Sequence, residues 1–563
     1  MGKGKRALQS LFSTTSLLER YDPSKDIDQE AILTPPLSSA AHSLSPLLKE
    51  TDNDSPLVRD HLVSARNPPK TVKSRPEELE DVPLSMLITT YFGYIVLILF
   101  GHISDFFGKL LRSSEYVPFS FIDGYAPMLS NFESFYRRRL YRRISDCFNR
   151  PVTGIPGRFI TLLDRGSIDF NRTFRYTGRT TTLLNLGSYN YLGFSQNEGP
   201  CADSVKQSLL SYGLSTNGSR FEGGSHELHT NAEELIARFV GREAAMIVAT
   251  EFAANSTTLP ALVSKNCLVI SDEYNHPSLI DGARISGAAS RVFKHNSVDS
   301  LEQVLRQAIS QGQPRTHRPW KKILVVVEGL YANEGTILRL PEILELKRRY
   351  RFYLYIDEAH SIGSLGPCGR GICDYWGISP SEVDIMMGSF SKSFSAAGGY
   401  VAGSRAIIDH LRLQCYSSIY GESLPIPVLQ QIISSVKIIL GEEGTNDGIR
   451  RIETLAFNAR YFSSRLREMG FIIYGDIDSP IIPLVLFNPA NIPSFSRECL
   501  SRGIAVNVVA YPNVPLVSGR AKFCISAAHT KEDLDWALDH ISEIGDLLGL
   551  KLCKCPTPTP TRD

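Results

Sequence analysis

Beyond Asn185 the sequence alternates short apolar runs, rich in β-branched residues, with stretches of helical period and glycine-rich turns. This alternation predicts an α/β fold with a parallel or mixed sheet whose strands are joined by crossover helices. Strands are expected at residues 245–249, 268–271, 323–327, 354–356 and 385–387. Ligands of such sheets bind beyond the carboxyl ends of the strands, so polar residues directly after these runs are candidate site residues.

Two residues that follow these runs carry opposite charges. Asp357 opens the sequence Asp-Glu-Ala-His after one run, and Lys392 lies in the Ser/Gly-rich segment 388–394 after the next. A lysine amine can form a Schiff base with pyridoxal phosphate, and a carboxylate can keep the pyridine nitrogen of that cofactor protonated. The pair therefore predicts an enzyme that uses pyridoxal 5'-phosphate.

Two histidines are further candidates. His360 follows Asp357 by three positions and could reach the phenolic oxygen of the cofactor or a substrate carbonyl. His276 lies between a predicted strand and a helical stretch, where an imidazole could stack on the cofactor ring, although a structural histidine is the commoner case. Asp-Glu-Ala-His also occurs in helicases, but no Gly-Lys pair in this sequence is followed by Ser or Thr, which excludes that interpretation.

Two segments are candidates for binding the cofactor phosphate, which requires backbone N–H groups at a helix N-terminus together with hydroxyls. One is the turn at 250–255, which contains Phe252 and Ala253, and the other is Ser389 with Ser391 beside the lysine. Serine-rich turns also commonly cap helices, so each segment keeps a purely structural alternative.

Charge and cysteine content exclude other classes of function. The formal net charge of +1 gives no electrostatic case for binding nucleic acid. The ten cysteines include no C-x-x-C pair, so we expect no metal site and a reducing compartment.

Length and composition divide the chain into several parts, because 563 residues exceed one compact domain. We expect a disordered cytosolic tail at 1–80, a membrane-embedded helix at 81–110, a linker or arm at 111–184, a large cofactor-binding domain at 185–425, a small C-terminal α/β domain at 426–550 and a tail at 551–563. From the residues at the start of the sequence we expect neither a secretory signal nor a myristoylation signal.

The apolar segment at 82–104 contains no Asp, Glu, Lys or Arg. As a helix its 23 residues would extend over about 34 Å, enough for a hydrocarbon core of about 30 Å. A membrane-embedded helix is favoured because the segment precedes the folded domains, and a buried core helix is the alternative. An arginine-rich stretch at 135–143 could contact anionic headgroups or form a solvated helix face.

Together these motifs resemble the α-oxoamine synthases. The resemblance rests on Asn-Leu-Gly-Ser-Tyr-Asn-Tyr-Leu-Gly at 185–193 and on residues 272–282, 327–329, 357–363, 388–399 and 526–530. It extends from about the apolar segment to Leu550 and implies a fold-type I pyridoxal-phosphate enzyme with a large sheet domain and a smaller C-terminal domain. Within the family the chain is most similar to the lysine-bearing catalytic subunits that condense L-serine with palmitoyl-CoA.

That resemblance implies the decarboxylative condensation of L-serine with a long-chain acyl-CoA to 3-ketodihydrosphingosine. It assigns Lys392 as the Schiff-base lysine and acid/base, Asp357 as the partner of the pyridine nitrogen, His276 as the ring-stacking residue and His360 as a cofactor and substrate contact. Ser389, Phe252 and Ala253 would contact the cofactor, and Tyr189, Arg520 and Lys522 the substrate.

The resemblance also implies partners and a location. The chain would work as a heterodimer with a homologous subunit that lacks the lysine, with possible small membrane regulators. It would lie in the endoplasmic reticulum membrane with its catalytic body in the cytosol.

Several positions depart from the family pattern. Glu251 and Ser395 replace usual glycines, Pro277 replaces a small residue, and Lys522 stands where the family has an arginine, with Arg520 two residues upstream. A carboxylate at Glu251 would repel a phosphate unless it points away, and a lysine cannot reproduce the bidentate fork of an arginine. The alternatives are therefore a diverged enzyme that uses another amino acid or a polyketide acyl chain, and a non-catalytic regulatory paralogue.

Overall fold

The computed structural model of the chain describes residues 84–111, 124–125, 131–511 and 513–553. All of them belong to the unit formed by residues 66–563. The predicted tail at 1–80 lies outside the described residues, as does the predicted C-terminal tail beyond residue 553.

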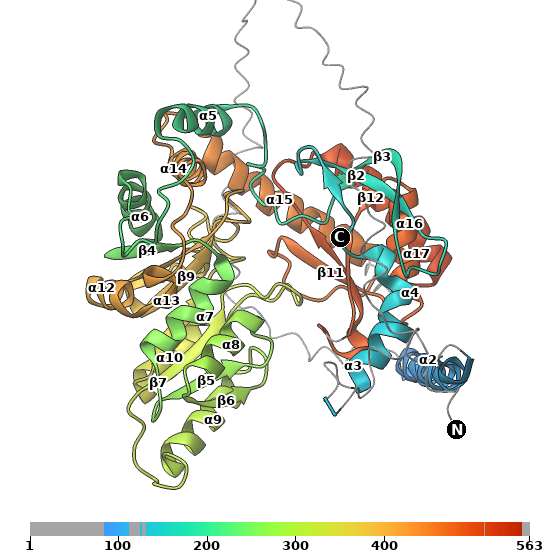
Figure 1. Ribbon diagram of the computed structural model, residues 1–563, viewed down its shortest axis with the longest axis horizontal. Helices are drawn as coiled ribbons and strands as arrows, with labels where there is room; N and C mark the ends of the chain where they lie inside the picture. Colours follow the sequence, from blue (N-terminus) through green and yellow to red (C-terminus); the bar gives the residue numbers. More distant parts are fainter. Residues whose placement is uncertain (1–83, 112–123, 126–130, 512, 554–563) are drawn as a thin grey trace, which may run out of the picture. The chain divides into compact units, whose positions relative to one another are not determined.

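A mixed seven-stranded sheet forms the centre of the predicted large domain (Figure 1). Its strand order is β4-β10-β9-β8-β7-β5-β6. The strands are β4 (Ala244–Val248), β5 (Leu268–Asp272), β6 (Ala289–Phe293), β7 (Ile323–Glu328), β8 (Tyr353–Asp357), β9 (Ile385–Ser389) and β10 (Gly399–Gly403). β10 runs antiparallel to both its neighbours, whereas β9, β8, β7, β5 and β6 are parallel. The fold-type I prediction is confirmed, and the expected strands differ from the observed ones only at their ends.

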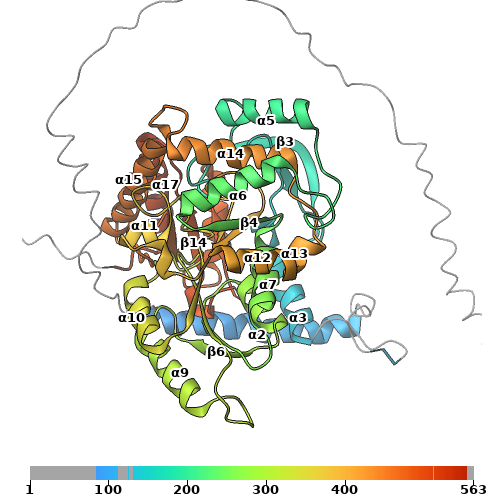
Figure 2. The same cartoon turned by 90° about the vertical axis from the view of Figure 1, so that its left-hand side faces the viewer.

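Both faces of this sheet are buried except at the edge strand β6, which explains why the other strands read as continuous apolar runs. On β8, Leu354 and Ile356 pack into one cluster and Tyr355 into another. The first cluster includes α6 (Glu227–Val240), α10 (Leu340–Tyr350) and α14 (Ile426–Leu440), and the second includes α7 (Glu251–Leu262), α8 (Pro277–Ile285) and α12 (Arg405–Gln414). Figure 2 shows α6 and α14 on one side of β4 and α12 on the other.

The remaining helical elements connect these layers or cover the smaller sheets. They are α3 (Asn131–Tyr136), η4 (Arg137–Tyr141), α4 (Arg142–Ile144), η5 (Ser145–Cys147), α5 (Pro200–Tyr212), α9 (Val298–Gln311), α11 (Ile372–Trp376), η6 (Pro380–Glu382), α13 (Tyr416–Ile419), α15 (Asp447–Glu468), α16 (Asn491–Ser501), η7 (Leu516–Ser518) and α17 (Lys531–Leu548).

Two smaller sheets join the predicted arm to the C-terminal part of the chain. The first has the order β1 (Val152–Thr153), β2 (Phe159–Gly166), β3 (Arg175–Asn185), β12 (Ile504–Ala505), and the second β11 (Ile481–Val485), β14 (Arg520–Cys524), β13 (Asn507–Val509). β12 pairs with β3 in parallel, and the backbone N–H of Cys524 donates to the carbonyl of Leu186 over 2.8 Å. These contacts place the residues that follow β3 beside β14.

The apolar segment forms helix α2 (Leu84–Leu111), which is not a buried core helix. Only 17% of the most apolar stretch of this helix, within Met86–Gly108, is buried. By length and composition the helix could cross a membrane. Met86 and Leu87 pack against Val485 and Phe487, whereas a series of large side chains faces outward: Ile88, Phe92, Ile95, Leu99, Phe100, Phe106 and Phe107. The prediction of an apolar helix is therefore confirmed.

Candidate active site

The carboxyl ends of four neighbouring strands bring the candidate residues together. β8 ends at Asp357, β9 ends at Ser389 just before Lys392, β7 ends at Glu328, and the turn after β5 carries His276. The first turn of α7 lies at the same edge of the sheet. The backbone of Glu251 is so close to Gly399 on β10 that a Cβ atom built on this glycine would lie 3.4 Å from the α-carbon of Glu251. This is the position at which open α/β sheets bind ligands.

Asp357 is a buried carboxylate held in a fixed orientation. Its Oδ2 accepts from Asn255 Nδ2 over 2.7 Å, and its Oδ1 accepts from the backbone N–H of Ala359 over 2.8 Å. Asn255 is oriented in turn by Tyr355, whose hydroxyl donates to Oδ1 over 2.8 Å. Burial raises the pKa of Asp357 above its usual value, and these two donors offset only part of the rise. A cationic N–H donor would be a favourable partner for such a carboxylate.

His276 caps helix α8 and exposes its ring. Its Nδ1 accepts from the backbone N–H of Ser278 over 3.3 Å and lies 2.8 Å from the hydroxyl of that serine. The backbone N–H of His276 donates to the buried carboxyl of Glu328. Burial, together with the charge of Asp357, raises the pKa of Glu328 well above its usual value. The imidazole is thus held at its edge, the residue is exposed, and the ring of Phe252 lies 6.3 Å away in an edge arrangement.

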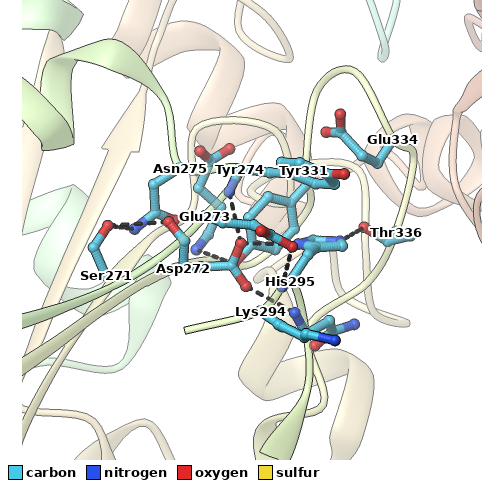
Figure 3. Close-up of polar contacts among 12 residues, drawn as sticks. Ser271, Asp272, Glu273, Tyr274, Asn275, Lys294, His295, Tyr331, Glu334 and Thr336 are labelled. Atoms are coloured by element: carbon cyan, nitrogen blue, oxygen red, sulfur yellow. Dashed lines mark hydrogen bonds and ion pairs between the residues drawn. The ribbon is translucent and has the colours of Figure 1, made fainter. Parts of the chain in front are cut away.

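A second network fixes the strand end that precedes His276 (Figure 3). Asp272 accepts from the backbone N–H groups of Tyr274 and Asn296 over 2.9 and 2.8 Å. Its Oδ1 also lies 2.9 Å from Nδ1 of His295, whose Nε2 lies 2.7 Å from the hydroxyl of Thr336. The turn that carries His276 is therefore braced from two neighbouring segments.

His360 belongs to an aromatic group beside Asp357. Its Nδ1 lies 2.8 Å from the hydroxyl of Tyr191, and its ring meets Tyr189 edge-on with the centroids 4.9 Å apart. Burial, reinforced by the cations of Lys392 and Lys522, holds the pKa of His360 well below its usual value. The ring is therefore neutral near pH 7 and can act as a hydrogen-bond partner but not as a cation.

Lys392 is buried and forms an ion pair with Glu251. The carboxylate of Glu251 contacts Lys392 Nζ through one oxygen, and through the other it accepts from the hydroxyls of Ser389 and Ser391 over 2.6 and 2.8 Å. Burial alone would raise the pKa of Glu251, but the lysine and the two serines outweigh it, and the pKa lies below its usual value. Glu251 therefore points toward the lysine, not away from it.

Ser395, which replaces a usual glycine of the lysine loop, adopts a left-handed conformation with φ of 50°. This region favours glycine, and a serine there carries a steric cost of about 1 kcal/mol. The Ser395 hydroxyl donates to Oδ1 of Asn190 over 2.9 Å, which ties the lysine loop to the segment that contains Tyr189.

Lys522 and Arg520 lie on β14 and have different surroundings. Lys522 Nζ donates to the hydroxyl of Tyr189 and lies 4.9 Å from the centroid of that ring. Arg520 is fully buried, and it donates to the carbonyls of Ser518 and Asn333 over 2.8 and 3.0 Å. Of the two cations, Lys522 is the one that reaches the group formed by Tyr189 and His360.

A cavity of about 740 Å³ lies between η4, α4, β2 and the strands β12 and β13, and Lys522 is one of its lining residues, whereas Lys392, Asp357, His276 and His360 are not. Its lining is mainly apolar and aromatic, with Tyr136, Phe148, Val508 and Tyr511 among its walls. Ligand pockets commonly have volumes of about 300–1,000 Å³.

The described residues fit pyridoxal phosphate at the ring and less well at the phosphate. Asp357 can accept from a pyridinium N–H, and His276 offers a ring face. The N–H groups of Phe252 and Ala253 in the first turn of α7 have no acceptor within the helix and, with the hydroxyls of Ser389 and Ser391, make up the candidate phosphate cradle. Glu251 places a carboxylate in the same cradle.

The sequence identified most of these residues but not their supports. Asn255, Glu328 and Asp272 hold Asp357, His276 and the preceding turn in place. All three lie in segments that the sequence singled out, but it assigned them no individual role. A buried polar residue after a strand or one turn into a helix is a usable signal, because such a residue needs a partner.

The matching family model is that of the class I and II aminotransferases, which covers residues 181–541. Over 488 residues the chain is 50% identical to a Saccharomyces cerevisiae protein named serine palmitoyltransferase 2, an alignment that spans 85% of this chain and 87% of the relative. Over 478 residues it is 47% identical to human serine palmitoyltransferase 3, spanning 84% of this chain and 87% of the relative.

Similar structures include serine palmitoyltransferases. One solved with its pyridoxal phosphate superposes with a TM-score of 0.65 at 27% identity, over 75% of this chain and 98% of the other. The Sphingomonas wittichii enzyme superposes with a TM-score of 0.65 at 26% identity, over 75% of this chain and 99% of the other.

Proposed function

The chain belongs to the α-oxoamine synthases within the class I and II aminotransferase family, and from this premise we propose that it is a serine C-palmitoyltransferase. It condenses L-serine with a long-chain acyl-CoA and releases CoA and CO₂, which yields 3-ketodihydrosphingosine in the first step of sphingolipid synthesis. The observation that carries the proposal is a buried lysine and a buried aspartate at adjacent strand ends in a chain 50% identical to serine palmitoyltransferase 2.

Lys392 and Asp357 have the central roles. When bound, pyridoxal phosphate supplies an electron sink that stabilises negative charge on the α-carbon of the amino acid. Asp357, oriented by Asn255, would accept from the ring N–H and keep that nitrogen protonated. Lys392 would hold the cofactor through its amine, and once the amino group of serine had displaced that amine, its Nζ would take the α-proton of serine and later return a proton to the same carbon. Burial of both residues keeps water from the reacting carbon.

The two histidines position the reactants. His276 is fixed by Ser278 and Glu328 at its edge and backbone, which leaves its face for stacking on the cofactor ring. His360 is neutral and fixed by Tyr191, so it orients the phenolic oxygen or the acyl carbonyl by hydrogen bonding and contributes no full charge.

Lys522 binds the carboxylate of the amino acid. It is buried beside Tyr189 and His360, and its ammonium can pair with a carboxylate as a point charge. Arg520 has a supporting role in this assignment, because its donors serve the backbone of Ser518 and Asn333. A lysine in place of the arginine of the family favours a second candidate function, the condensation of another amino acid.

The apolar cavity that Lys522 helps to line is the candidate site for the acyl chain. Its lining is mainly apolar and can bury hydrocarbon, and it includes Lys522, the residue assigned to the carboxylate of the amino acid. The outward apolar face of α2 fits a lipid environment that supplies such acyl-CoA. We therefore assign the chain to the endoplasmic reticulum membrane, with its catalytic body in the cytosol and a homologous lysine-lacking subunit as partner.

Product analysis tests this function. The full chain, purified with and without its co-expressed partner subunit, is incubated with palmitoyl-CoA and one of L-serine, L-alanine or glycine. The expected product is 3-ketodihydrosphingosine, with serine preferred and the activity dependent on the partner. Preference for another amino acid would support the second candidate, and absence of any condensation in the complex would support a regulatory chain. Release of the intact chain by carbonate extraction would contradict membrane embedding.

A further inference from the structure

Glu251 uses the groups that a cofactor phosphate requires. Its carboxylate accepts from the hydroxyls of Ser389 and Ser391 over 2.6 and 2.8 Å and pairs with Lys392. It is also the first residue of α7, whose first turn presents backbone N–H groups. The three donors to this carboxylate all belong to the end of β9 and the segment that follows it, whereas Glu251 itself starts α7.

A phosphate and this carboxylate cannot share the cradle as it stands. A phosphate monoester carries a charge of about −1.5 to −2 at neutral pH and needs several donors. In the observed arrangement Ser389 and Ser391 already donate to Glu251, and the carboxylate is ionised because its pKa is lowered. Two anions in a largely buried site repel each other more strongly than in water.

A role for Glu251 confined to the N-terminus of helix α7 does not explain why its side chain points inward. An acidic residue in the first turn of a helix is stabilised by the helix dipole while its side chain points to solvent. Here the side chain is only 28% exposed and turns inward to three partners, one of which is a lysine with 8% of its side chain exposed. The remaining exposure leaves a path by which the carboxylate can rotate toward solvent.

We propose that Glu251 is an internal competitor for the cofactor phosphate. This inference rests on the proposed use of pyridoxal phosphate. In the cofactor-free chain Glu251 satisfies Lys392 and the two serines, and the cofactor must displace it before the phosphate can enter the cradle. The amine of Lys392 is then released from its ion pair as the cofactor arrives. The affinity of the chain for the cofactor is therefore lower than it would be if the donors of the cradle were not already bound to Glu251.

Two ligands separate the phosphate end from the rest of the site. Pyridoxal phosphate carries the phosphate, whereas pyridoxal has the same ring and aldehyde without it. Equilibrium dialysis of the full chain with each ligand gives two dissociation constants for the wild type, Glu251→Gln and Glu251→Gly. Glu453→Gln, an exposed glutamate on α15, is the matched control.

We expect both Glu251 variants to bind pyridoxal phosphate at least about tenfold more tightly than the wild type, a gain of about 1.4 kcal/mol. Their affinity for pyridoxal should rise less than their affinity for pyridoxal phosphate, because pyridoxal gains only the release of Lys392 and not the phosphate donors. Glu251→Gln keeps the shape of the side chain, so it carries the test if Glu251→Gly does not fold. An unchanged or weaker affinity for pyridoxal phosphate would overturn the inference, as would an equal gain for both ligands.

Failure of the proposed function has a different signature. If neither the wild type nor any variant binds pyridoxal phosphate, the cofactor assignment falls and the inference falls with it. If all of them bind it with equal affinity, the cofactor assignment stands and only the role of Glu251 is refuted.

Discussion

The two ends of the candidate active site use carboxylates in opposite ways. At the ring end, Asp357 is buried, held by Asn255 and Ala359, and has a raised pKa that a cationic ring would lower. At the phosphate end, Glu251 is already paired with Lys392 and has a lowered pKa. At the ring end burial leaves a carboxylate with a raised pKa, whereas at the phosphate end the serine hydroxyls and Lys392 already share a carboxylate as partner. One substitution at the start of a helix can therefore change the cost of binding while the catalytic residues stay in place.

The largest effect is expected from removing the amine that both ends share. Lys392→Ala should lower the rate of condensation by about 10⁴-fold or more, because proton transfer and covalent anchoring are lost together. Single-turnover assays with serine and palmitoyl-CoA measure this rate. The exposed Lys206→Ala is the control and should keep wild-type activity. Substantial activity in the Lys392 variant would mean that another lysine holds the cofactor.

A substitution at Asp357 tests the ring end of the site separately from the phosphate end. Asp357→Asn keeps the size of the side chain but removes the charge that keeps the ring nitrogen protonated, so kcat should fall by about 10³-fold while the cofactor still binds. Dialysis with pyridoxal phosphate, run beside the kinetics, separates binding from rate. Asp281→Asn, on the partly exposed surface of α8, is the control. A loss of cofactor binding without a fall in kcat of the loaded fraction would contradict this role.

A third carboxylate extends the comparison to stability. Glu358 is fully buried, and burial raises its pKa to about 7 despite hydrogen bonds from Ser361 and Ile372. Because its pKa is higher in the folded chain than in the unfolded chain, its contribution to stability is complete below about pH 4.5 and is lost as the pH rises toward 7. The loss is about 3 kcal/mol.

Glu358→Gln should therefore flatten the dependence of stability on pH. Urea unfolding at pH 5 and pH 8 should show that the variant is more stable than the wild type at pH 8, by up to about 3 kcal/mol. Glu453→Gln is the control and should follow the wild type at both pH values. A variant that loses stability equally at pH 5 and pH 8 would show that Glu358 is ionised in the folded chain.

The smallest effect is expected at the substrate corner. Lys522→Ala should raise KM for serine by about tenfold with a smaller change in kcat, because it removes a charge-assisted contact to the carboxylate. Lys522→Arg should restore part of the affinity. Initial rates over a range of serine concentrations measure both constants. A fall in kcat with unchanged KM would assign Lys522 to the reaction itself.

The ring end was predictable from the sequence and the phosphate end only in part. Asp357 and Lys392 follow continuous apolar runs, and a buried strand that ends in a charged residue has a strong local pattern. The sequence marked Glu251 as a departure, but the direction of its side chain depends on Ser389 and Ser391, which lie more than a hundred positions away. The sequence pattern alone does not predict a contact between residues so far apart in the chain.

The same limit applies to the rest of the fold. The pairing of β3 with β12, which brings Tyr189 to Lys522, joins segments separated by more than three hundred residues. Asn255 lies in the turn that the sequence offered as a phosphate site, whereas the structure shows its side chain donating to Asp357, more than a hundred positions away. The domain boundaries proposed from composition and the roles of the individual site residues remain predictions.

The most direct test of the account is to locate the lysine that binds the cofactor. The full chain, loaded with pyridoxal phosphate, is reduced with borohydride, digested and mapped by mass spectrometry. The account predicts one labelled peptide, which contains Lys392, and no label in the Lys392→Ala variant. A label on another lysine, or no label at a cofactor concentration that saturates binding in dialysis, would contradict it.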